Sequence, residues 1–451
     1  MRRHVSPQDD DDHVAVGVDD EAAQIHHHLL DEPRSATAST IAYELQPLRT
    51  PSQLHGGGDT TMAVIVDAPP MPPRDAPASK ILFLNGLRGL AAYFVVVQHS
   101  HWGDRNFGAY GVDIFFVLSA FLLTMLLDRK VRQLLERRAR WHSWVLALLD
   151  YFQRRFLRVY PLFLLTALAL WMMPNERRQQ FWIGAHSRVE FDFWRVITFE
   201  FDYRFHVFWT LPVEIGYYFL IPPLVIGVAL CRRWWWIPLL PLTYWAVYDG
   251  MRSYRGDHQP LRQHLNTFVA GSISALVLTR AETWIEQHNF KFRWFHALAL
   301  RGVEYFFFGM LISVMYGGVF FVYLHWDPMP AWSPSAYLSG FIAIVIACEI
   351  LLPGPLSRLF EWNILIFYGK ISYSMYLLHS FVIYTNYIKS QTGYTQKIAT
   401  MGLICALCTT TYYLVEYPML RLAARISKIL KEKDSAINRK LAADAATPAV
   451  V

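Results

Sequence analysis

Arg88 and His99 lie eleven residues apart in the apolar segment NGLRGLAAYFVVVQHSHWG. At 100° per residue their side chains fall on nearly the same helix face, but they are separated by about 16 Å along the axis. They therefore cannot touch each other. Ionisable groups in a bilayer are costly and are functional candidates by default. The spacing favours a pair that holds two ends of one elongated ligand. The alternative is that Arg88 pairs with a carboxylate elsewhere and His99 marks the membrane interface.

Two more ionisable groups interrupt apolar segments, Glu214 in FWTLPVEIGYYFL and His379 in YGKISYSMYLLHSF. A carboxylate inside an apolar segment must be paired or protonated. For Glu214 the alternative is a buried structural hydrogen bond, and for His379 it is a packed, satisfied histidine. Further candidates for substrate or donor binding are Asp113, Ser119, Trp209, Ser372 and Tyr373.

Arg155 and Arg158 occur at i and i+3 in FQRRFLRVYP, so they share a helix face. Two guanidinium groups placed in this way can clamp a phosphate. The alternative is that they belong only to the positive charge of a cytosolic loop. We place them at the cytosolic mouth of the third membrane span.

These residue types together suit acyl transfer from a thioester. The reaction needs a base that takes the acceptor proton and donors for the developing oxyanion. His99 is the natural base, because the pKa of histidine lies near the working pH. Glu214 could orient a histidine or position the acceptor hydroxyl, and His379 could be a second acid/base or an oxyanion donor. The arginines would hold the phosphates of coenzyme A.

The elements that must position these groups are transmembrane helices. Of the 451 residues, 54% are hydrophobic, and the mean hydropathy is +0.21. Soluble chains are usually about 45–50% apolar. A membrane span needs about 20 mostly apolar residues. The sequence predicts an all-α membrane protein with spans near 81–100, 111–127, 155–173, 209–230, 234–249, 264–280, 302–323, 335–352, 362–385 and 397–416.

The distribution of basic residues orients these spans. The segment DRKVRQLLERRARWH between spans two and three is strongly basic and should be a cytosolic loop. With ten spans, both termini are then cytosolic. His99, Asp113, Glu214 and His379 fall near the non-cytosolic level, whereas the arginines lie deeper or on the cytosolic side.

Outside the spans the sequence is polar. Residues 1–78 predict a disordered cytosolic tail, residues 79–420 the membrane domain, and residues 421–451 a basic, then disordered, cytosolic tail. No secretory signal peptide opens the chain. We predict no metal site, because His26, His27 and His28 suit a solvated patch and Cys405 and Cys408 suit small buried hydrophobes. The net charge of +6 belongs to cytosolic loops and does not indicate nucleic-acid binding.

Six motifs in order resemble those of acyltransferase family 3, a family of membrane acyltransferases, over about residues 80–420. They are GLRGLAAYFVVVQH with Arg88 and His99, GVDIFFVLSAF, FQRRFLRVYP, FWTLPVEIGYYF, GKISYSMYLLH ending at His379, and EYPML at Glu416. The family usually has Ser-Gly where this chain has Ser119-Ala120, which adds one methyl group at a close-packing position.

The resemblance implies transfer of an acyl group, most often acetyl, from cytosolic acyl coenzyme A, with His99 essential and Arg88 its partner. It implies no permanently bound cofactor. The long N-terminal tail and the short loops are typical of a fungal-like member. The acceptor is expected to be a hydroxyl group, and the sequence leaves open whether a sugar, a lipid or a secondary metabolite carries it. The sequence also leaves the oligomeric state open. It does not distinguish the endoplasmic reticulum, a later secretory compartment and the plasma membrane as the membrane that holds the protein.

A transporter or lipid flippase is the main alternative, since intramembrane Arg, His and Glu also build proton relays. Against it, the sequence has no inverted repeat and no paired Gly/Pro-broken helices. The other membrane O-acyltransferase superfamily has its histidine late in the chain, whereas the strongest histidine motif here is in the first span. A receptor or scaffold would give no reason for charged groups at one depth.

Overall fold

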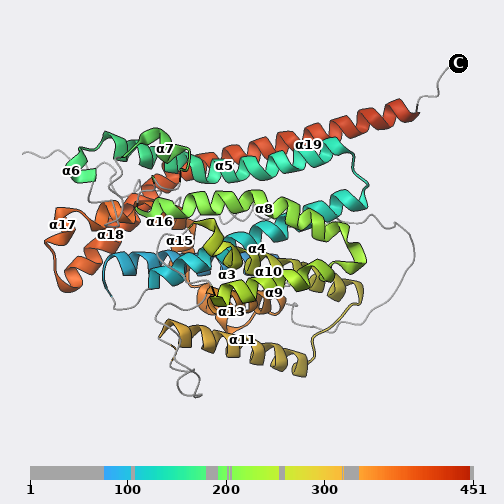
Figure 1. The fold of residues 1–451 in the computed structure, drawn as a ribbon, viewed down its shortest axis with the longest axis horizontal. Helices are drawn as coiled ribbons and strands as arrows, with labels where there is room; N and C mark the ends of the chain where they lie inside the picture. Colours follow the sequence, from blue (N-terminus) through green and yellow to red (C-terminus); the bar gives the residue numbers. More distant parts are fainter. Residues whose placement is uncertain are drawn as a thin grey trace, which may run out of the picture. The chain divides into compact units, whose positions relative to one another are not determined.

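The computed structural model describes residues 76–102, 107–178, 191–200, 203, 206–252, 260–316, 318 and 335–446. Contacts divide the chain into Met1–Ala78 and Ser79–Val451, and the following description concerns the second unit. The described residues form helices and no strand (Figure 1). The predictions for residues 1–75, including His26, His27 and His28, and for residues 447–451 lie outside the described residues.

A helix, or a pair of helices, occupies each of the ten predicted spans. The helices are α3 (Ala76–His99), α4 (Phe107–Glu136), α5 (Trp141–Met172), α6 (Asn175–Arg178), α7 (Phe193–Ile197), η3 (His206–Trp209), α8 (Thr210–Leu230), η4 (Arg232–Trp234), α9 (Trp236–Arg252), α10 (Leu261–Gln287), α11 (Trp294–Met315), α13 (Ser335–Leu351), α14 (Pro355–Phe360), α15 (Asn363–Lys370), α16 (Ser372–Ile383), α17 (Asn386–Lys389), α18 (Gly393–Thr411), the π-helical turn η5 (Tyr412–Glu416) and α19 (Tyr417–Ala446).

Five helical stretches among the described residues are long and apolar enough to cross a membrane. They are Phe107–Glu136, Trp141–Met172, Val207–Leu230, Trp294–Met315 and Gly393–Leu441. The chain is therefore a helical membrane protein, whereas the number of ten crossings and the cytosolic placement of both termini stay predictions.

The start of α5 and the whole of α19 differ from the sequence prediction. The predicted basic loop is helical except for residues 137–140, and the predicted disordered tail after residue 421 is wrong as far as Ala446. Between Met419 and Thr447 there is no Gly or Pro, and helix-forming residues dominate. This segment packs along α5, where Ser143 Oγ donates to Asp434 at 2.6 Å and Gln153 Nε2 donates to Ser427 Oγ at 3.0 Å. Figure 1 shows the two helices running side by side.

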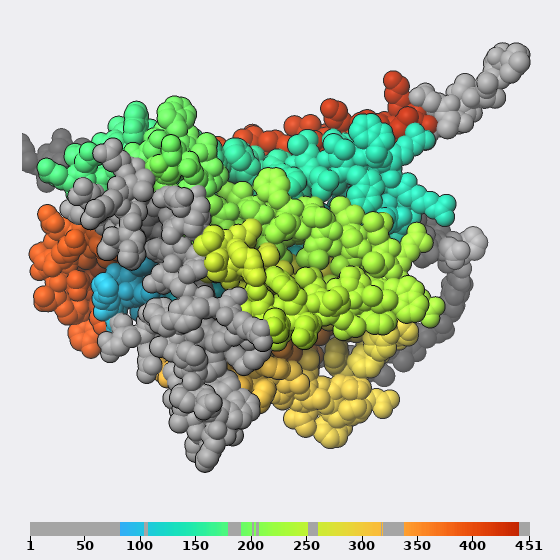
Figure 2. Space-filling model, in the orientation of Figure 1, coloured from blue at the N-terminus to red at the C-terminus, as the bar shows by residue number. Residues whose placement is uncertain are grey.

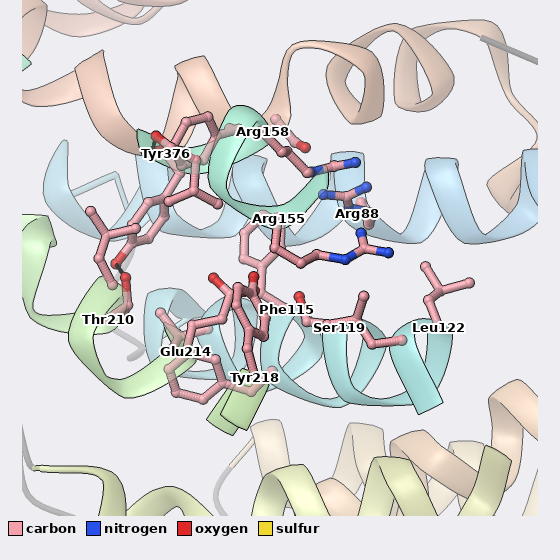
Figure 3. Close-up of a pocket in the computed structure, with 17 residues that line it drawn as sticks. Arg88, Phe115, Ser119, Leu122, Arg155, Arg158, Thr210, Glu214, Tyr218 and Tyr376 are labelled. Atoms are coloured by element: carbon pink, nitrogen blue, oxygen red, sulfur yellow. Dashed lines mark hydrogen bonds between the residues drawn. The ribbon is translucent and has the colours of Figure 1, made fainter. Parts of the chain in front are cut away.

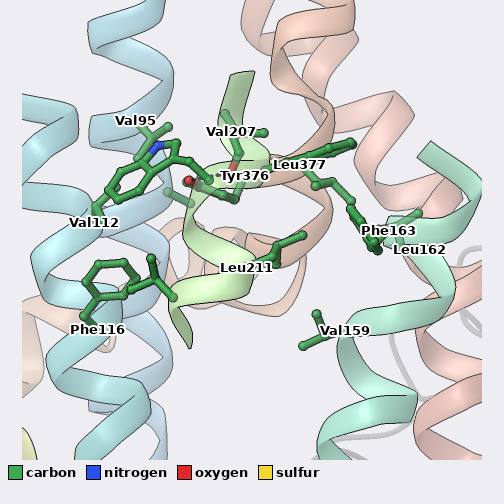
Figure 4. Close-up of a cluster of buried hydrophobic side chains, with 14 of the residues drawn as sticks. Val95, Val112, Phe116, Val159, Leu162, Phe163, Val207, Leu211, Tyr376 and Leu377 are labelled. Atoms are coloured by element: carbon green, nitrogen blue, oxygen red, sulfur yellow. Dashed lines mark hydrogen bonds between the residues drawn. The ribbon is translucent and has the colours of Figure 1, made fainter. Parts of the chain in front are cut away.

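α4 lies at the centre of the unit. In its most apolar 18-residue stretch 72% is buried inside the protein, against 28% in that of α11. Helices that are hydrophobic all round are core elements or face lipid. α4 packs against α8, α10 and α13. In Figure 4, side chains of α3 and α4 (Val95, Val112, Phe116) face those of α5 (Val159, Leu162, Phe163) across the start of α8 and α16.

The outer surface of α8 and α9 is rich in exposed apolar side chains. Phe219, Leu240 and Tyr244 are 62%, 60% and 71% exposed. These two helices fill the centre of the face seen in Figure 2. Large exposed apolar surfaces mark membrane or protein contacts, so this face fits contact with lipid chains.

α3 approaches α14 and α15 at glycines. A Cβ atom added at Gly86 would overlap the carbonyl oxygen of Phe360, and one at Gly89 would overlap that of Leu365. Small residues let helix backbones come close in membranes. Because α3 carries Arg88 and His99, these contacts fix the depth and rotation of both side chains.

Replacing Gly89 with valine should therefore destabilise the protein by about 1–3 kcal/mol, since the added atoms must push the two backbones apart. The measurement is the midpoint of thermal unfolding in detergent. Gly227→Val is the matched control, because a Cβ atom at Gly227 meets nothing within 4 Å. Equal midpoints for the two variants would contradict the close-contact interpretation.

Candidate active site

His99 and His379 are in direct contact. His99 ends α3 and His379 lies in α16, and their Nδ1 and Nε2 atoms are 3.1 Å apart. The ring centroids are 4.9 Å apart. His379 is fully buried, whereas His99 is only partly buried. The sequence placed the two histidines at one level, and the structure brings them within hydrogen-bond distance.

The backbone fixes which nitrogen of His379 carries the proton. Its Nδ1 lies 3.0 Å from the carbonyl oxygen of Met375 and 2.8 Å from that of Tyr376. Carbonyl oxygens only accept, so Nδ1 is the protonated nitrogen and Nε2 of the neutral ring is an acceptor. His379 Nε2 then accepts from His99 Nδ1, which also lies 2.9 Å from the carbonyl oxygen of Val95. In this tautomer, His99 Nε2 is the basic nitrogen.

This arrangement bears on two roles that the sequence suggests and that stay predictions. Both ring nitrogens of His379 are engaged, so the ring does not suit the role of an oxyanion donor. It holds the imidazole of His99 in one tautomer, which is the task of the third member in a catalytic triad. Glu214, expected to orient a histidine, lies instead among arginines.

A pocket opens between α3, α4, α5, α8 and α16. The arginines that the sequence singled out, Arg88, Arg155 and Arg158, all line it, together with Glu214. Figure 3 shows the three guanidinium groups gathered on one side and Thr210 with Tyr376 on the opposite side. The remaining residues of the lining are Val112, Phe115, Phe116, Ser119, Leu122, Leu123, Val159, Leu211, Tyr218, Ser372 and Tyr373.

The pocket is strongly basic at its arginine end. Arg88 is repelled by Arg158 and attracted by Glu214. The predicted separation of Glu214 from the arginines is therefore wrong. Glu214 is the fifth residue of α8 and so lies about 6 Å along the axis from the start of that helix. Arg155 and Arg158 share a face as predicted and lie in the middle of α5, which begins at Trp141, while their place at the cytosolic mouth of a membrane span stays a prediction.

The Tyr376 end of the pocket is near His379, although neither His99 nor His379 is among the lining residues. Tyr376 is three residues before His379 in α16, and their ring centroids are 6.4 Å apart. Its hydroxyl donates to the carbonyl oxygen of Val207 at 3.1 Å and accepts from Thr210 Oγ1 at 3.0 Å. The pocket thus has a cationic end and a hydroxyl-lined end beside the histidine pair.

Some predicted residues line the pocket and others do not. Ser119, Ser372 and Tyr373 line it, and the Tyr373 hydroxyl also donates to the carbonyl oxygen of Val159 at 2.7 Å. Asp113 is buried in α4 but is not among the lining residues. Trp209 packs against the rings of Phe116 and His264, with centroids 6.2 and 5.2 Å away, and is also outside the lining.

Three polar lining residues were missing from the predicted site, Thr210, Tyr218 and Tyr376, as were the apolar ones. Helical spacing could have found two of them. Tyr218 follows Glu214 at i+4, and Tyr376 follows Ser372 at i+4, so each shares a face with a predicted residue.

Comparison with protein families gives one match over most of the chain. The model of acyltransferase family 3, described as an acyltransferase domain, matches residues 81–415. This range contains both histidines, the three arginines and Glu214. No solved structure matches the chain significantly.

Three bacterial relatives illustrate the similarity. The chain is 24% identical over 366 residues to a protein of Bacillus subtilis (strain 168) provisionally named peptidoglycan O-acetyltransferase YrhL, which covers 74% of this chain and 54% of the relative. It is 22% identical over 362 residues to a provisionally named O-acetyltransferase of Staphylococcus aureus (strain COL), covering 74% of this chain and 56% of the relative. It is 24% identical over 386 residues to O-acetyltransferase OatA of Staphylococcus aureus (strain MRSA252), covering 79% of this chain and 60% of the relative. The chain thus spans little more than half the length of these relatives.

Proposed function

This chain belongs to acyltransferase family 3, and we propose that it is an acyl-coenzyme-A-dependent O-acyltransferase that moves an acyl group, most often acetyl, onto a hydroxyl of a sugar, lipid or secondary-metabolite acceptor. The observation that carries the proposal is the His99–His379 contact beside a pocket lined by three arginines. Acyl coenzyme A carries a reactive thioester at one end and nucleotide phosphates at the other. Transfer from it needs a base with a fixed tautomer near the thioester and a separate cationic end of the pocket for the phosphates.

In the proposed reaction, His99 Nε2 takes the proton of the acceptor hydroxyl while the oxygen bonds to the thioester carbonyl carbon. The carbon–sulfur bond then breaks, and His99 returns the proton to the leaving sulfur. The products are an ester and free coenzyme A. Because His99 Nδ1–H points at His379 Nε2, the positive charge that forms on His99 has an acceptor beside it.

Arg88, Arg155 and Arg158 hold the donor phosphates in this proposal. Guanidinium groups bind phosphate through paired, charge-assisted hydrogen bonds. An extended pantetheine arm is comparable in length to the 16 Å that separate Arg88 from His99 along α3 (about eleven residues at 1.5 Å each). Acyl coenzyme A acts here as a co-substrate, with no permanently bound cofactor, and the protein resides in an endomembrane or the plasma membrane.

His379→Phe should lower kcat by about 10- to 100-fold and leave the donor KM within about threefold, since it removes one of the two acceptors beside His99 Nδ1, the other being the Val95 carbonyl oxygen, without touching the arginines. His379→Gln should retain more activity, because its amide oxygen can accept the same hydrogen bond. The measurement is steady-state turnover of acyl coenzyme A in nanodiscs. Equal losses of kcat in the two variants would argue against an orienting role for His379.

The reaction itself is tested with radiolabelled acetyl coenzyme A and an extract of hydroxylated acceptors. We expect label to move from the donor to an acceptor in nanodiscs that contain the protein. The transporter hypothesis predicts neither donor binding nor turnover with any acceptor set, and the same polar residues would then form a proton or solute path.

A further inference from the structure

Glu416 lies at a local irregularity that the proposed reaction does not use. It ends the π-helical turn η5 between α18 and α19. Such single turns insert an extra residue into an α-helix and are frequent at functional sites. Glu416 is only 7% exposed. Glutamates are rarely this buried unless they are paired, so a partner is expected.

The partner of Glu416 is the first turn of α16. Its carboxylate accepts from the backbone N–H of Ser374 at 3.1 Å and also from the Ser374 hydroxyl. The first N–H groups of a helix have no partner within the helix, and the residue before α16, Ile371, provides no side-chain cap. Glu416 therefore caps α16 from a different helix, with the negative charge that the helix dipole favours.

The same carboxylate faces the basic end of the pocket. Glu416 attracts Arg158 and Arg88, while these two arginines repel each other. Ser372 and Tyr373, the residues just before Ser374, line the pocket. One carboxylate thus contacts the helix that carries Tyr376 and His379 and balances the arginines opposite that helix.

We propose that Glu416 is a positioning residue of the acyl-transfer site, an inference that rests on the proposed function. It has two separable tasks. Its charge holds Arg158 and Arg88 together for the phosphates of the donor, and its hydrogen bonds hold the first turn of α16, which sets the position of His379 two turns later.

Three substitutions of Glu416 separate these tasks. Glu416→Gln keeps an oxygen that can accept from Ser374 but removes the charge, so the donor KM should rise about tenfold while kcat stays within about threefold. Glu416→Ala removes both, so kcat should also fall by at least about tenfold. Glu416→Asp keeps the charge on a shorter side chain and should recover part of the donor KM. The measurement is steady-state turnover of acetyl coenzyme A in nanodiscs.

The matched control is Glu282→Gln, which removes a carboxylate paired with Arg129 away from the pocket. The inference is overturned if Glu416→Gln behaves like this control, or if kcat falls as far in Glu416→Gln as it does in Glu416→Ala. A wild-type protein that turns over no donor overturns the proposed function first and this inference with it. An active wild type with an unaffected Glu416→Gln variant overturns this inference alone.

Discussion

Acyl transfer by the His99→Ala variant should be about 10²- to 10⁴-fold slower than by the wild type, the range that positioned proton transfer contributes. The reason is the geometry of the histidine pair. His379 donates from Nδ1 to backbone carbonyls, and His99 Nδ1 lies 3.1 Å from His379 Nε2, so His99 Nε2 is the basic nitrogen of the pair. The measurement is label leaving acetyl coenzyme A in nanodiscs, with an equal amount of folded, inserted protein.

His101→Ala is the matched control for this experiment. His101 is an exposed histidine two residues further along the chain, outside α3. It should keep wild-type activity. A His99→Ala variant that retains more than about a tenth of the wild-type rate would exclude His99 as the essential base.

Loss of the pocket arginines should give the second largest effect. Arg158→Ala should raise the donor KM by about 10- to 100-fold, since it removes a charge-assisted contact to phosphate. The double variant with Arg155→Ala should raise it further. Arg158→Lys should recover only part of the affinity, because an ammonium group cannot form the paired hydrogen bonds of a guanidinium. The measurement is the donor KM at two salt concentrations.

Arg262→Ala is the control for the arginine series, because Arg262 is exposed and paired with Asp249 outside the pocket. It should leave the donor KM unchanged. If Arg158→Ala lowers kcat at an unchanged donor KM, the arginines act in the chemical step and the assignment of a phosphate end is wrong.

Local sequence patterns predicted much of this architecture. Apolar runs predicted the positions of the helices, and the i, i+3 spacing predicted that Arg155 and Arg158 share a face that lines one pocket. The eleven-residue spacing predicted that Arg88 and His99 point the same way without touching. These features depend on helix geometry within one segment, which a single sequence contains.

The rest depends on contacts between distant segments. Glu214 lies near the start of α8, where the predicted span also begins, but the three arginines that line the same pocket come from α3 and α5, and the pattern within one segment does not show such neighbours. The order in α19 comes from its packing against α5, which its polar composition does not reveal. The cap that Glu416 gives α16 requires a π turn, for which no residue pattern in YYLVE is diagnostic.

The two histidines in contact are 280 positions apart in the chain. Synthesis proceeds at about 5–20 residues per second, so His379 leaves the ribosome roughly 14–56 s after His99. During that interval the first segment is already made, but its base has no orienting neighbour. If the proposed reaction is right, a chain truncated before α16 should have at most the low activity expected of His379→Phe.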